Sequence, residues 1–292
     1  MIGTEWLVPI VVGVGAAVMR RRSAHAVESD YASRFPVDAN GIAEGAQAYT
    51  LTGTNGRSLL LVHGFGDTPQ SIRYVADRVH EAGYTVHAPL LPGHGRSPQK
   101  FAVTSPAEYY EAARQALAGL RPSEQWVGVV GQSMGGAISA RLVSESPDVQ
   151  VLVLLAPYLV PTDGARRAAA SSWMWGILKP YVRGQDGRSV HDPAANLQSR
   201  AYGSFSPGAL RALIATADAG LRALPKLTLP TLVVFSEQDN RIPKANAMKA
   251  MESLRAPSER HWVTGCGHVI AVDYCKDKVT ELLLDFLARH AD

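Results

Sequence analysis

The sequence predicts an α/β fold, in which helices flank a mostly parallel central sheet. From about residue 46 onward, short apolar segments of strand length alternate with longer segments of helical period. Composition agrees, because 46% of the 292 residues are hydrophobic and 19% are charged, which suits a large core and excludes a disordered, collagen-like or coiled-coil chain. The net charge of +3 is too small to indicate a nucleic-acid partner.

Most expected strands are short apolar runs, whereas residues 46–52 alternate weakly between apolar and polar side chains. The expected strands lie at residues 46–52, 58–62, 85–89, 125–130, 150–155, 229–235 and 260–264. The first expected helix begins at Thr68 and Pro69 and stops at Gly83, and a capping box at Ser105 begins a second, which runs to about Leu120. Two further helices are expected at residues 134–146 and 276–290.

The alternation lapses over residues 158–224, which are rich in proline and glycine, and resumes afterwards. We therefore expect one α/β domain over residues 46–292, with a small cap inserted at about 158–224.

The first 45 residues form a separate region. Residues 6–19 are uncharged and mostly apolar, and Arg20, Arg21 and Arg22 follow them. Fourteen residues of helix span about 21 Å, which is shorter than the roughly 30 Å of a bilayer core. Three interpretations stay open: an uncleaved membrane anchor, a cleaved secretory signal, and a soluble tail.

The order of the charges favours the anchor, with the main domain on the cytoplasmic side of the membrane. A secreted or periplasmic location and a soluble cytoplasmic one are the alternatives. Residues 23–45 are polar and rich in alanine and glycine, so we expect a linker there.

The chain has two cysteines, Cys266 and Cys275, which by themselves can form neither a disulfide framework nor a zinc site. We expect a reduced pair of buried thiols.

The sharpest motif runs from Gly131 to Gly135 and reads Gly-Gln-Ser-Met-Gly. It matches G-x-S-x-G and lies between an expected strand and an expected helix, where a strained turn lifts the serine oxygen above the sheet. Ser133 is therefore the candidate nucleophile.

A serine hydroxyl needs an oriented base, and in this arrangement the acid and then the histidine follow the nucleophile along the chain. His268 lies in a glycine-lined loop after the last expected strand, whereas His290 lies at the end of the last helix. Asp239 follows the preceding strand and is the candidate acid. Glu237 competes with it, and Asp192 and Asp218, inside the expected cap, are poorer candidates.

The negative oxygen of a tetrahedral intermediate needs hydrogen-bond donors. The segment His63–Gly66 follows an expected strand, so the backbone amides of Phe65 and Met134 are the expected oxyanion donors. His63 and His94 are interpreted as loop residues that hold turns by hydrogen bonding.

With these motifs, the chain resembles an α/β-hydrolase of the bacterial carboxylesterase and monoacylglycerol-lipase type. The resemblance rests on HGFG at 63–66, PGHG at 92–95, GQSMGG at 131–136, the loop around Asp239 and GCGH at 265–268, and it covers residues 58–290. It implies the triad Ser133, Asp239 and His268, and it implies no metal and no cofactor.

The resulting hypothesis is a serine hydrolase that cleaves short to medium acyl esters or monoacylglycerols through an acyl-enzyme. Trp173 and Trp175 of the expected cap either line the acyl pocket or pack the cap onto the body. Thioester hydrolysis, cofactor-free perhydrolysis and carbon–carbon bond hydrolysis also use a serine and stay open. A non-catalytic binding protein at the membrane is the alternative from a different class. Membrane association would run through residues 6–19.

Overall fold

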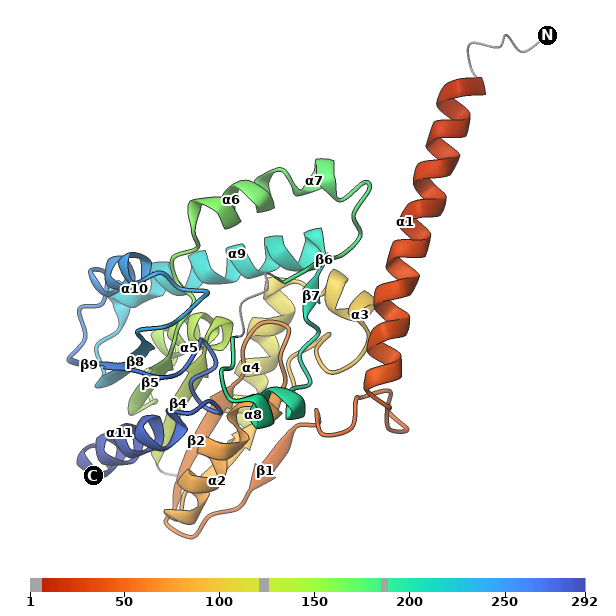
Figure 1. Ribbon diagram of the computed structural model, residues 1–292. Coiled ribbons are helices and arrows are strands. Elements are labelled where there is room, and N and C mark those ends of the chain that lie inside the picture. The colour runs from red at the N-terminus through yellow and green to blue at the C-terminus, as the bar shows by residue number, and fades with distance from the viewer. Residues whose placement is uncertain (1–6, 121–125, 185–188, 292) are drawn as a thin grey trace.

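Seven strands form one central sheet in the computed structural model, which describes residues 7–120, 126–184 and 189–291 (Figure 1). The strand order is β1-β3-β2-β4-β5-β8-β9, and every neighbouring pair is parallel except β1 with β3. The strands are β1 Tyr49–Leu51, β2 Arg57–Val62, β3 Thr85–Ala88, β4 Trp126–Gln132, β5 Val151–Leu155, β8 Thr231–Ser236 and β9 Ser258–Val263. The predicted fold class is confirmed.

All seven expected strands are present, with ends that differ from the expected ones by up to three residues. The expected start of the fourth strand, Gln125, lies outside the described residues. Along β4, β5 and β8 every residue is buried, because both faces of the central sheet are covered.

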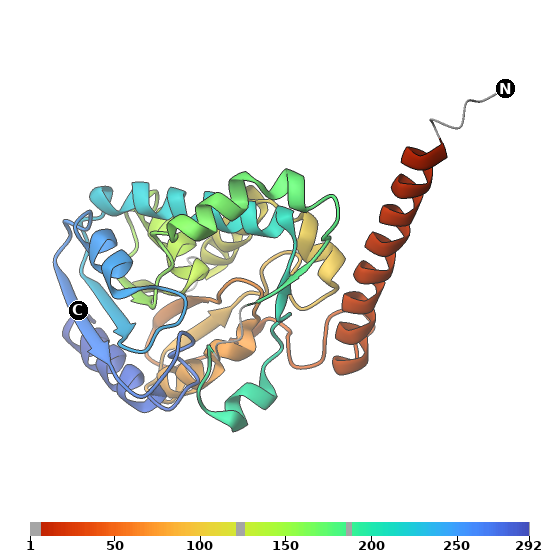
Figure 2. The same ribbon diagram turned by 45° about the horizontal axis from the view of Figure 1, so that its top comes forward.

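Two groups of helices cover the sheet (Figures 1 and 2). One face carries α2 (Arg73–Glu81), which follows the short 3-10 helix η2 (Pro69–Ile72), together with α11 (Lys276–Arg289). The other carries α4 (Pro106–Leu120), α5 (Met134–Ser144) and α9 (Pro207–Ala223). Because β2, β4, β8 and β9 are parallel, the loops that follow them all lie at the carboxyl ends of the strands, on the same side of the sheet.

The segment between β5 and β8 lies outside the sheet. It contains α6 (Asp163–Ala170), α7 (Ser172–Trp175), α8 (Pro193–Gln198), α9, the 3-10 helix η4 (Leu224–Lys226) and the small hairpin of β6 (Val182–Arg183) with β7 (Ser204–Phe205). The first two helices contact α9, which itself packs on α5. The expected cap corresponds to this segment and stays a prediction.

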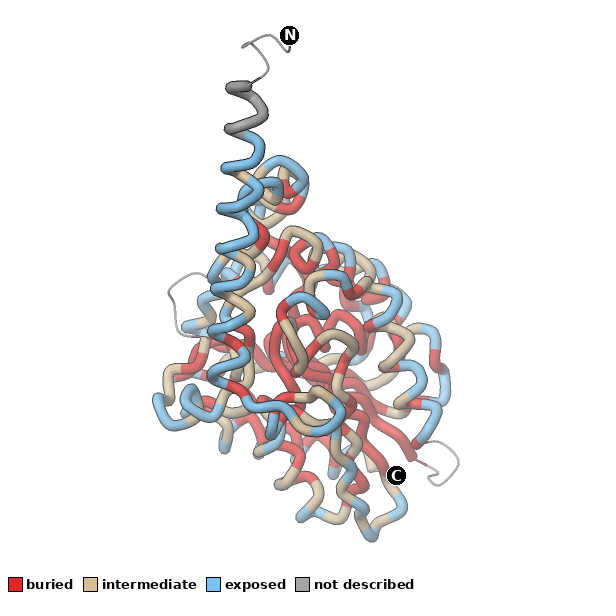
Figure 3. The backbone as a smooth tube through the Cα atoms, turned by 90° about the vertical axis from the view of Figure 1, so that its right-hand side faces the viewer, coloured by how far each residue is buried: buried red, intermediate tan, exposed pale blue. Residues whose placement is uncertain are grey.

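The N-terminal region differs from the expected linker, because α1 runs without interruption over Leu7–Arg34. The sequence of its second half explains this: alanines and charged residues favour a helix, Asp30 and Arg34 form an i,i+4 ion pair at 3.2 Å, and Tyr31 is buried against the body. Figure 3 shows the helix extending beyond the body, mostly exposed along its length. Within the described residues, no helix combines the length and hydropathy needed to cross a bilayer.

Candidate active site

Ser133 lies at the sharp turn between β4 and α5. Its backbone has φ 54° and ψ −118°, a conformation that costs a residue with a side chain about 1–3 kcal/mol. Backbone hydrogen bonds hold it: the Ser133 amide donates to the Leu155 carbonyl at 2.9 Å, and the Ser133 carbonyl accepts from the amides of Gly136 and Tyr158, both at 3.0 Å. The surrounding fold therefore imposes the strained turn.

The glycines of the motif are required by close backbone approach. A Cβ added at Gly135 would lie 2.1 Å from the Val62 carbonyl oxygen, and one added at Gly131 would lie 2.5 Å from the Gly135 carbonyl oxygen. Real atoms do not approach so closely, so the turn admits no side chain at either position.

His268 joins the three predicted triad residues. Its Nε2 lies 2.7 Å from the Ser133 hydroxyl, and its Nδ1 lies 2.7 Å from Oδ2 of Asp239. A carboxylate only accepts hydrogen bonds, so Nδ1 donates to Asp239 and Nε2 is left to accept the serine proton. The His268 and Asp239 side chains are 8% and 3% exposed, which excludes most of the competing water.

Asp239 is held in its charged form. Its Oδ1 accepts from the amides of Arg241 at 2.7 Å and Ile242 at 2.9 Å. Burial alone would raise the pKa of this carboxyl, but the neighbouring His268 and the hydrogen bonds outweigh burial, so the pKa of Asp239 lies below its ordinary value.

The competing acids are engaged elsewhere. Glu237 accepts two hydrogen bonds from Lys244, at 2.9 and 3.0 Å, and Asp218 pairs with Arg166 at 2.7 Å. Asp192 caps α8 through the Ala194 amide at 2.9 Å. The carbonyl of His290, the other histidine near the C-terminus, accepts from the Trp126 indole.

Two buried histidines hold the loop of residues 63–66 beside Ser133. His63 donates from Nδ1 to the Gly64 carbonyl at 2.9 Å and accepts at Nε2 from the Leu91 amide at 3.1 Å. His94 accepts at Nε2 from the Gly66 amide at 3.1 Å. Burial lowers the pKa of His63 to about 4 and that of His94 well below its ordinary value, so each ring is neutral and supplies one donor and one acceptor. Their interpretation as loop supports is confirmed.

The two expected oxyanion donors belong to the 63–66 loop and to the start of α5, and their role stays a prediction. A Cβ added at Gly64 would lie 3.2 Å from the Ser133 Cβ, so the loop that contains Phe65 approaches the serine closely. Met134 begins α5, where backbone amides lack partners in the preceding turn. In the described part of the chain, no acceptor takes a hydrogen bond from either amide.

Most of the chain matches a known protein family. A family model described as serine aminopeptidase, S33, matches residues 54–274. The chain belongs to this family.

Among curated relatives, this S33-family chain is 28% identical over 235 residues to a thermostable monoacylglycerol lipase of a Bacillus species, covering 80% of this chain and 91% of the relative. It is 24% identical over 236 residues to a carboxylesterase of Bacillus subtilis, and the match covers 80% of this chain and 93% of the carboxylesterase. The expected resemblance to bacterial carboxylesterases and monoacylglycerol lipases is confirmed.

Solved structures share the fold. A structure reported for LipS and LipT, two metagenome-derived lipolytic enzymes, superposes with a TM-score of 0.76 at 24% identity, covering 85% of this chain and all of the other. The monoacylglycerol lipase of Paleococcus ferrophilus superposes with a TM-score of 0.71 at 18% identity, and the match covers 83% of this chain and 98% of the lipase. The sheet of this S33-family chain is therefore an α/β-hydrolase sheet.

The expectation of a reduced cysteine pair is wrong, because Cys266 and Cys275 form a disulfide. The loop that carries His268 folds back on itself and brings the two Cα atoms to 5.7 Å, within the range that a disulfide spans. Two cysteines in a sequence give no distance between them, so their number alone could not predict the bond.

Asp273 lies in the same loop and was missed by the sequence analysis. The carboxylate accepts from the amides of Gly267 at 2.7 Å, and of His191 and Asp192, both at 2.8 Å. Burial raises the pKa of Asp273, but these backbone hydrogen bonds outweigh it and hold the pKa below its ordinary value. The S33-family chain thus ties its histidine loop to residues 189–192, and no motif marks this acid.

Asp67 is a second acid that the sequence analysis missed. It follows the 63–66 loop, is buried, and accepts from the Thr68 amide at 2.8 Å. Burial raises its pKa to about 6, and the hydrogen bonds and the nearby His268 only partly oppose the shift.

The two tryptophans of the expected cap lie in different environments. Trp173 is 69% exposed, whereas the indole of Trp175 donates to the Ala168 carbonyl at 2.8 Å. Their contact with substrate stays a prediction.

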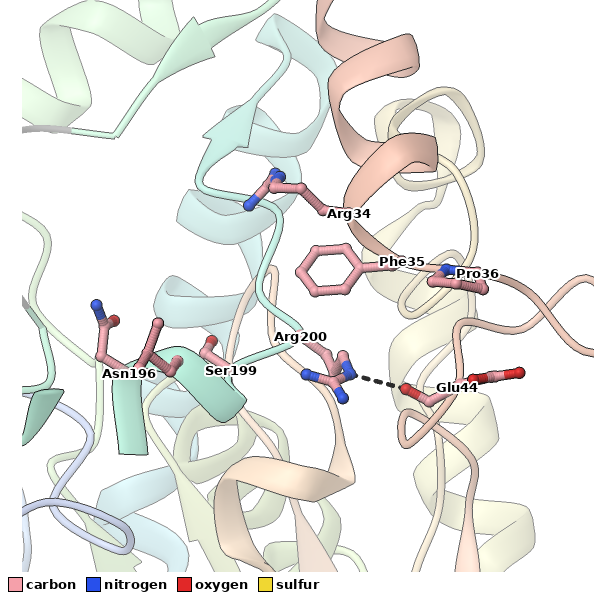
Figure 4. A pocket seen from close by; sticks show the side chains of 8 residues that line it. Arg34, Phe35, Pro36, Glu44, Asn196, Ser199 and Arg200 are labelled. Carbon is pink, nitrogen blue, oxygen red and sulfur yellow. Dashed lines mark hydrogen bonds between the residues drawn. The ribbon is translucent and has the colours of Figure 1, made fainter. Parts of the chain in front are cut away.

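A pocket of about 390 Å³ lies between the end of α1 and α8 (Figure 4). None of its lining residues belongs to the triad. Phe35 of the wall lies between the guanidinium groups of Arg34 and Arg200.

Proposed function

We propose that this protein is a serine hydrolase that cleaves carboxylic esters through an acyl-enzyme. The observation that carries the proposal is the continuous pair of 2.7 Å contacts from Asp239 through His268 to the Ser133 hydroxyl. The names of the Bacillus relatives, a monoacylglycerol lipase and a carboxylesterase, support an ester substrate.

In this proposal, Ser133 attacks the ester carbonyl while Nε2 of His268 takes its proton. Asp239 orients the ring and stabilises the imidazolium. The amides of Phe65 and Met134 hold the negative oxygen, and losing one such donor typically costs about 3–4 kcal/mol in the transition state. His268 then delivers the proton to the leaving alcohol, and water attacks the acyl-enzyme by the reverse sequence.

Short to medium acyl esters and monoacylglycerols are the proposed substrates. The experiment is a panel of nitrophenyl esters from acetate to palmitate, with a monoacylglycerol, an acyl thioester and an aminoacyl nitroanilide added. The variant is Ser133→Ala, and its control is Ser144→Ala, at the far end of α5. We expect the control to match wild type and Ser133→Ala to lose at least about 10³-fold in rate.

Three outcomes would overturn this assignment. Cleavage of the nitroanilide or the thioester in place of esters would move the protein to the rival serine chemistries. Full activity in Ser133→Ala would remove the nucleophile. No cleavage of any substrate by wild type would favour a binding protein.

We further propose that a lipid surface contacts two segments, α1 and the segment of residues 172–178, which consists of α7 and the turn after it. Arg20 of α1 donates to the carbonyls of Gly176 and Ile177, so the two segments adjoin. They carry most of the large exposed apolar side chains in the part of the chain whose burial the structure describes: Val14, Val18, Met19, Trp173, Met174, Ile177 and Leu178. Arg21 and Arg22 are exposed beside them, which suits an anionic surface.

The test is sedimentation with vesicles of phosphatidylcholine and phosphatidylglycerol. Ile177→Glu should weaken binding, and Met248→Glu, an exposed position on α10 (Lys244–Met251), should not. Equal binding by both variants and wild type would refute this surface.

The location of the protein is a separate proposal. The anchor interpretation expected the domain on the cytoplasmic side, but a disulfide is typical of oxidising compartments. The bond between Cys266 and Cys275 supports the secreted or periplasmic alternative. Thiol labelling of the protein in unbroken cells, followed by fractionation, tests it, and a reduced pair in the cytoplasm would refute it.

A further inference from the structure

The two ends of α1 are buried very differently. Most described residues before Tyr31 are exposed, whereas Tyr31 and Phe35 are 3% and 9% exposed. Figure 3 shows this contrast along the helix. The end of α1 is therefore part of the folded domain.

Tyr31 begins a continuous series of aromatic contacts that ends at the candidate oxyanion loop. Its ring centroid lies 4.7 Å from that of Tyr202, which stacks on Phe101 at 4.8 Å and 18°. Phe101, on α3 (Pro98–Val103), lies 4.8 Å from Phe65 and 4.7 Å from His94. The series thus reaches Phe65, whose amide is the proposed oxyanion donor, and His94, which accepts a hydrogen bond from the amide of Gly66.

Tyr202 also binds the loop backbone directly. Its amide donates to the Gly66 carbonyl at 3.0 Å, and its hydroxyl donates to the Gly93 carbonyl at 2.6 Å. The hydroxyl accepts from the Arg96 amide at 3.1 Å. Tyr202 therefore joins the 63–66 loop, through its backbone amide, to the 92–96 loop, through its hydroxyl, and Tyr31 contacts its ring.

Phe35 secures the end of the helix. Arg34 and Arg200 lie over its ring, with guanidinium carbons 4.9 and 5.5 Å from the centroid. Arg200 also donates to the Glu44 carbonyl at 2.7 Å, as the dashed line in Figure 4 shows. The segment after α1 is thereby attached to the segment that leads to Tyr202.

We propose that Tyr31 is a positioning residue for the oxyanion loop, and that α1 serves catalysis through it. The proposal rests on the proposed function. The Phe65 amide must face the developing negative charge, and such donors act only when they are held at a distance of about 3 Å. With Tyr31 in place, the ring of Tyr202 contacts both Tyr31 and Phe101. Without it, Tyr202 and Phe101 gain freedom, and the 63–66 loop gains freedom with them.

The main test compares Tyr31→Ala with Tyr31→Phe, which keeps the ring and removes only the hydroxyl. His25→Ala, an exposed position on the same helix, is the control. We expect Tyr31→Ala to lower kcat about 10-fold, below the 10²–10³-fold loss on removing a whole donor, with KM changed less than about twofold. Tyr31→Phe and His25→Ala should remain within about twofold of wild type.

Two controls separate positioning from loss of folded protein. Titration with a serine-reactive phosphonate counts intact sites, and a kcat loss explained wholly by fewer sites would refute the proposal. Hydrogen exchange in a peptide covering residues 63–68 should be faster in Tyr31→Ala than in wild type. Unchanged exchange with unchanged kcat would also refute it. Because exchange needs no substrate, a wild type that cleaves no ester would overturn the proposed function while the role of Tyr31 is still measured.

Discussion

Replacing Asp67 with asparagine should stabilise the protein, and the gain should grow with pH. Asparagine keeps the shape of the side chain and can still accept from the Thr68 amide, which lies 2.8 Å from Oδ1. It removes only the ionisation, which burial opposes. The variant therefore isolates the cost of holding one charge next to the candidate site.

The magnitude follows from the pKa of Asp67, which burial raises from 3.8 to about 6. A raised pKa means that the folded state binds its proton more tightly than the unfolded state. The contribution of protonated Asp67 to the free energy of unfolding is fully present below pH 3.8 and is lost as the pH rises through 6. Asp67→Asn should thus exceed wild type by about 1 kcal/mol at pH 4.5 and about 3 kcal/mol at pH 7.5.

Urea unfolding of both proteins at the two pH values measures this difference. Titrating groups that do not interact with Asp67 are common to both chains, so their effects cancel when the variant is compared with wild type. An equal difference at both pH values, or one that shrinks as pH rises, would refute the reasoning.

Three further predictions concern the site and its frame. Asp239→Asn should lower kcat about 10⁴-fold at neutral pH with a melting temperature no higher than that of wild type, and a loss below tenfold would contradict its role. Cys275→Ser should lower the free energy of unfolding by about 2–3 kcal/mol, because the disulfide closes a short loop between cysteines nine positions apart. Calorimetry of both proteins measures this difference, and no change would show that the bond is not formed. Gly135→Ala should abolish activity or soluble expression. Gly119→Ala, whose added Cβ would have nothing within 4 Å, should be neutral or stabilising by up to about 1 kcal/mol. Similar melting temperatures for the two variants would contradict the packing argument.

The sequence predicted the sheet and the meeting of Ser133, Asp239 and His268 because both depend on local signals. A buried parallel strand is a continuous apolar run, and Ser133 and Asp239 each follow such a run. His268 follows β9, a mostly half-buried edge strand of mixed sequence, and its glycine-lined loop is the local signal there. Strand order then brings the loops together. These signals need no knowledge of long-range contacts.

What the sequence could not show depends on contacts between distant segments. The helix over residues 23–34 is favoured by Tyr31, whose partner Tyr202 lies far along the chain. Asp67 and Asp273 are single acids in loops, and only the folded chain shows that the first is buried and that the second accepts backbone amides. The disulfide likewise required a distance.

The order in which the site residues appear along the chain has a consequence for synthesis on the ribosome. His268 lies 135 positions after Ser133, and the last two strands of the sheet precede the acid and the base in turn: Asp239 follows β8, and His268 follows β9. A nascent chain can therefore fold its serine turn on β4 and α5 while it has neither acid nor base. Catalysis can begin only when β9 has added to the edge of β8, so the first hydrolytic turnover marks the completion of the sheet.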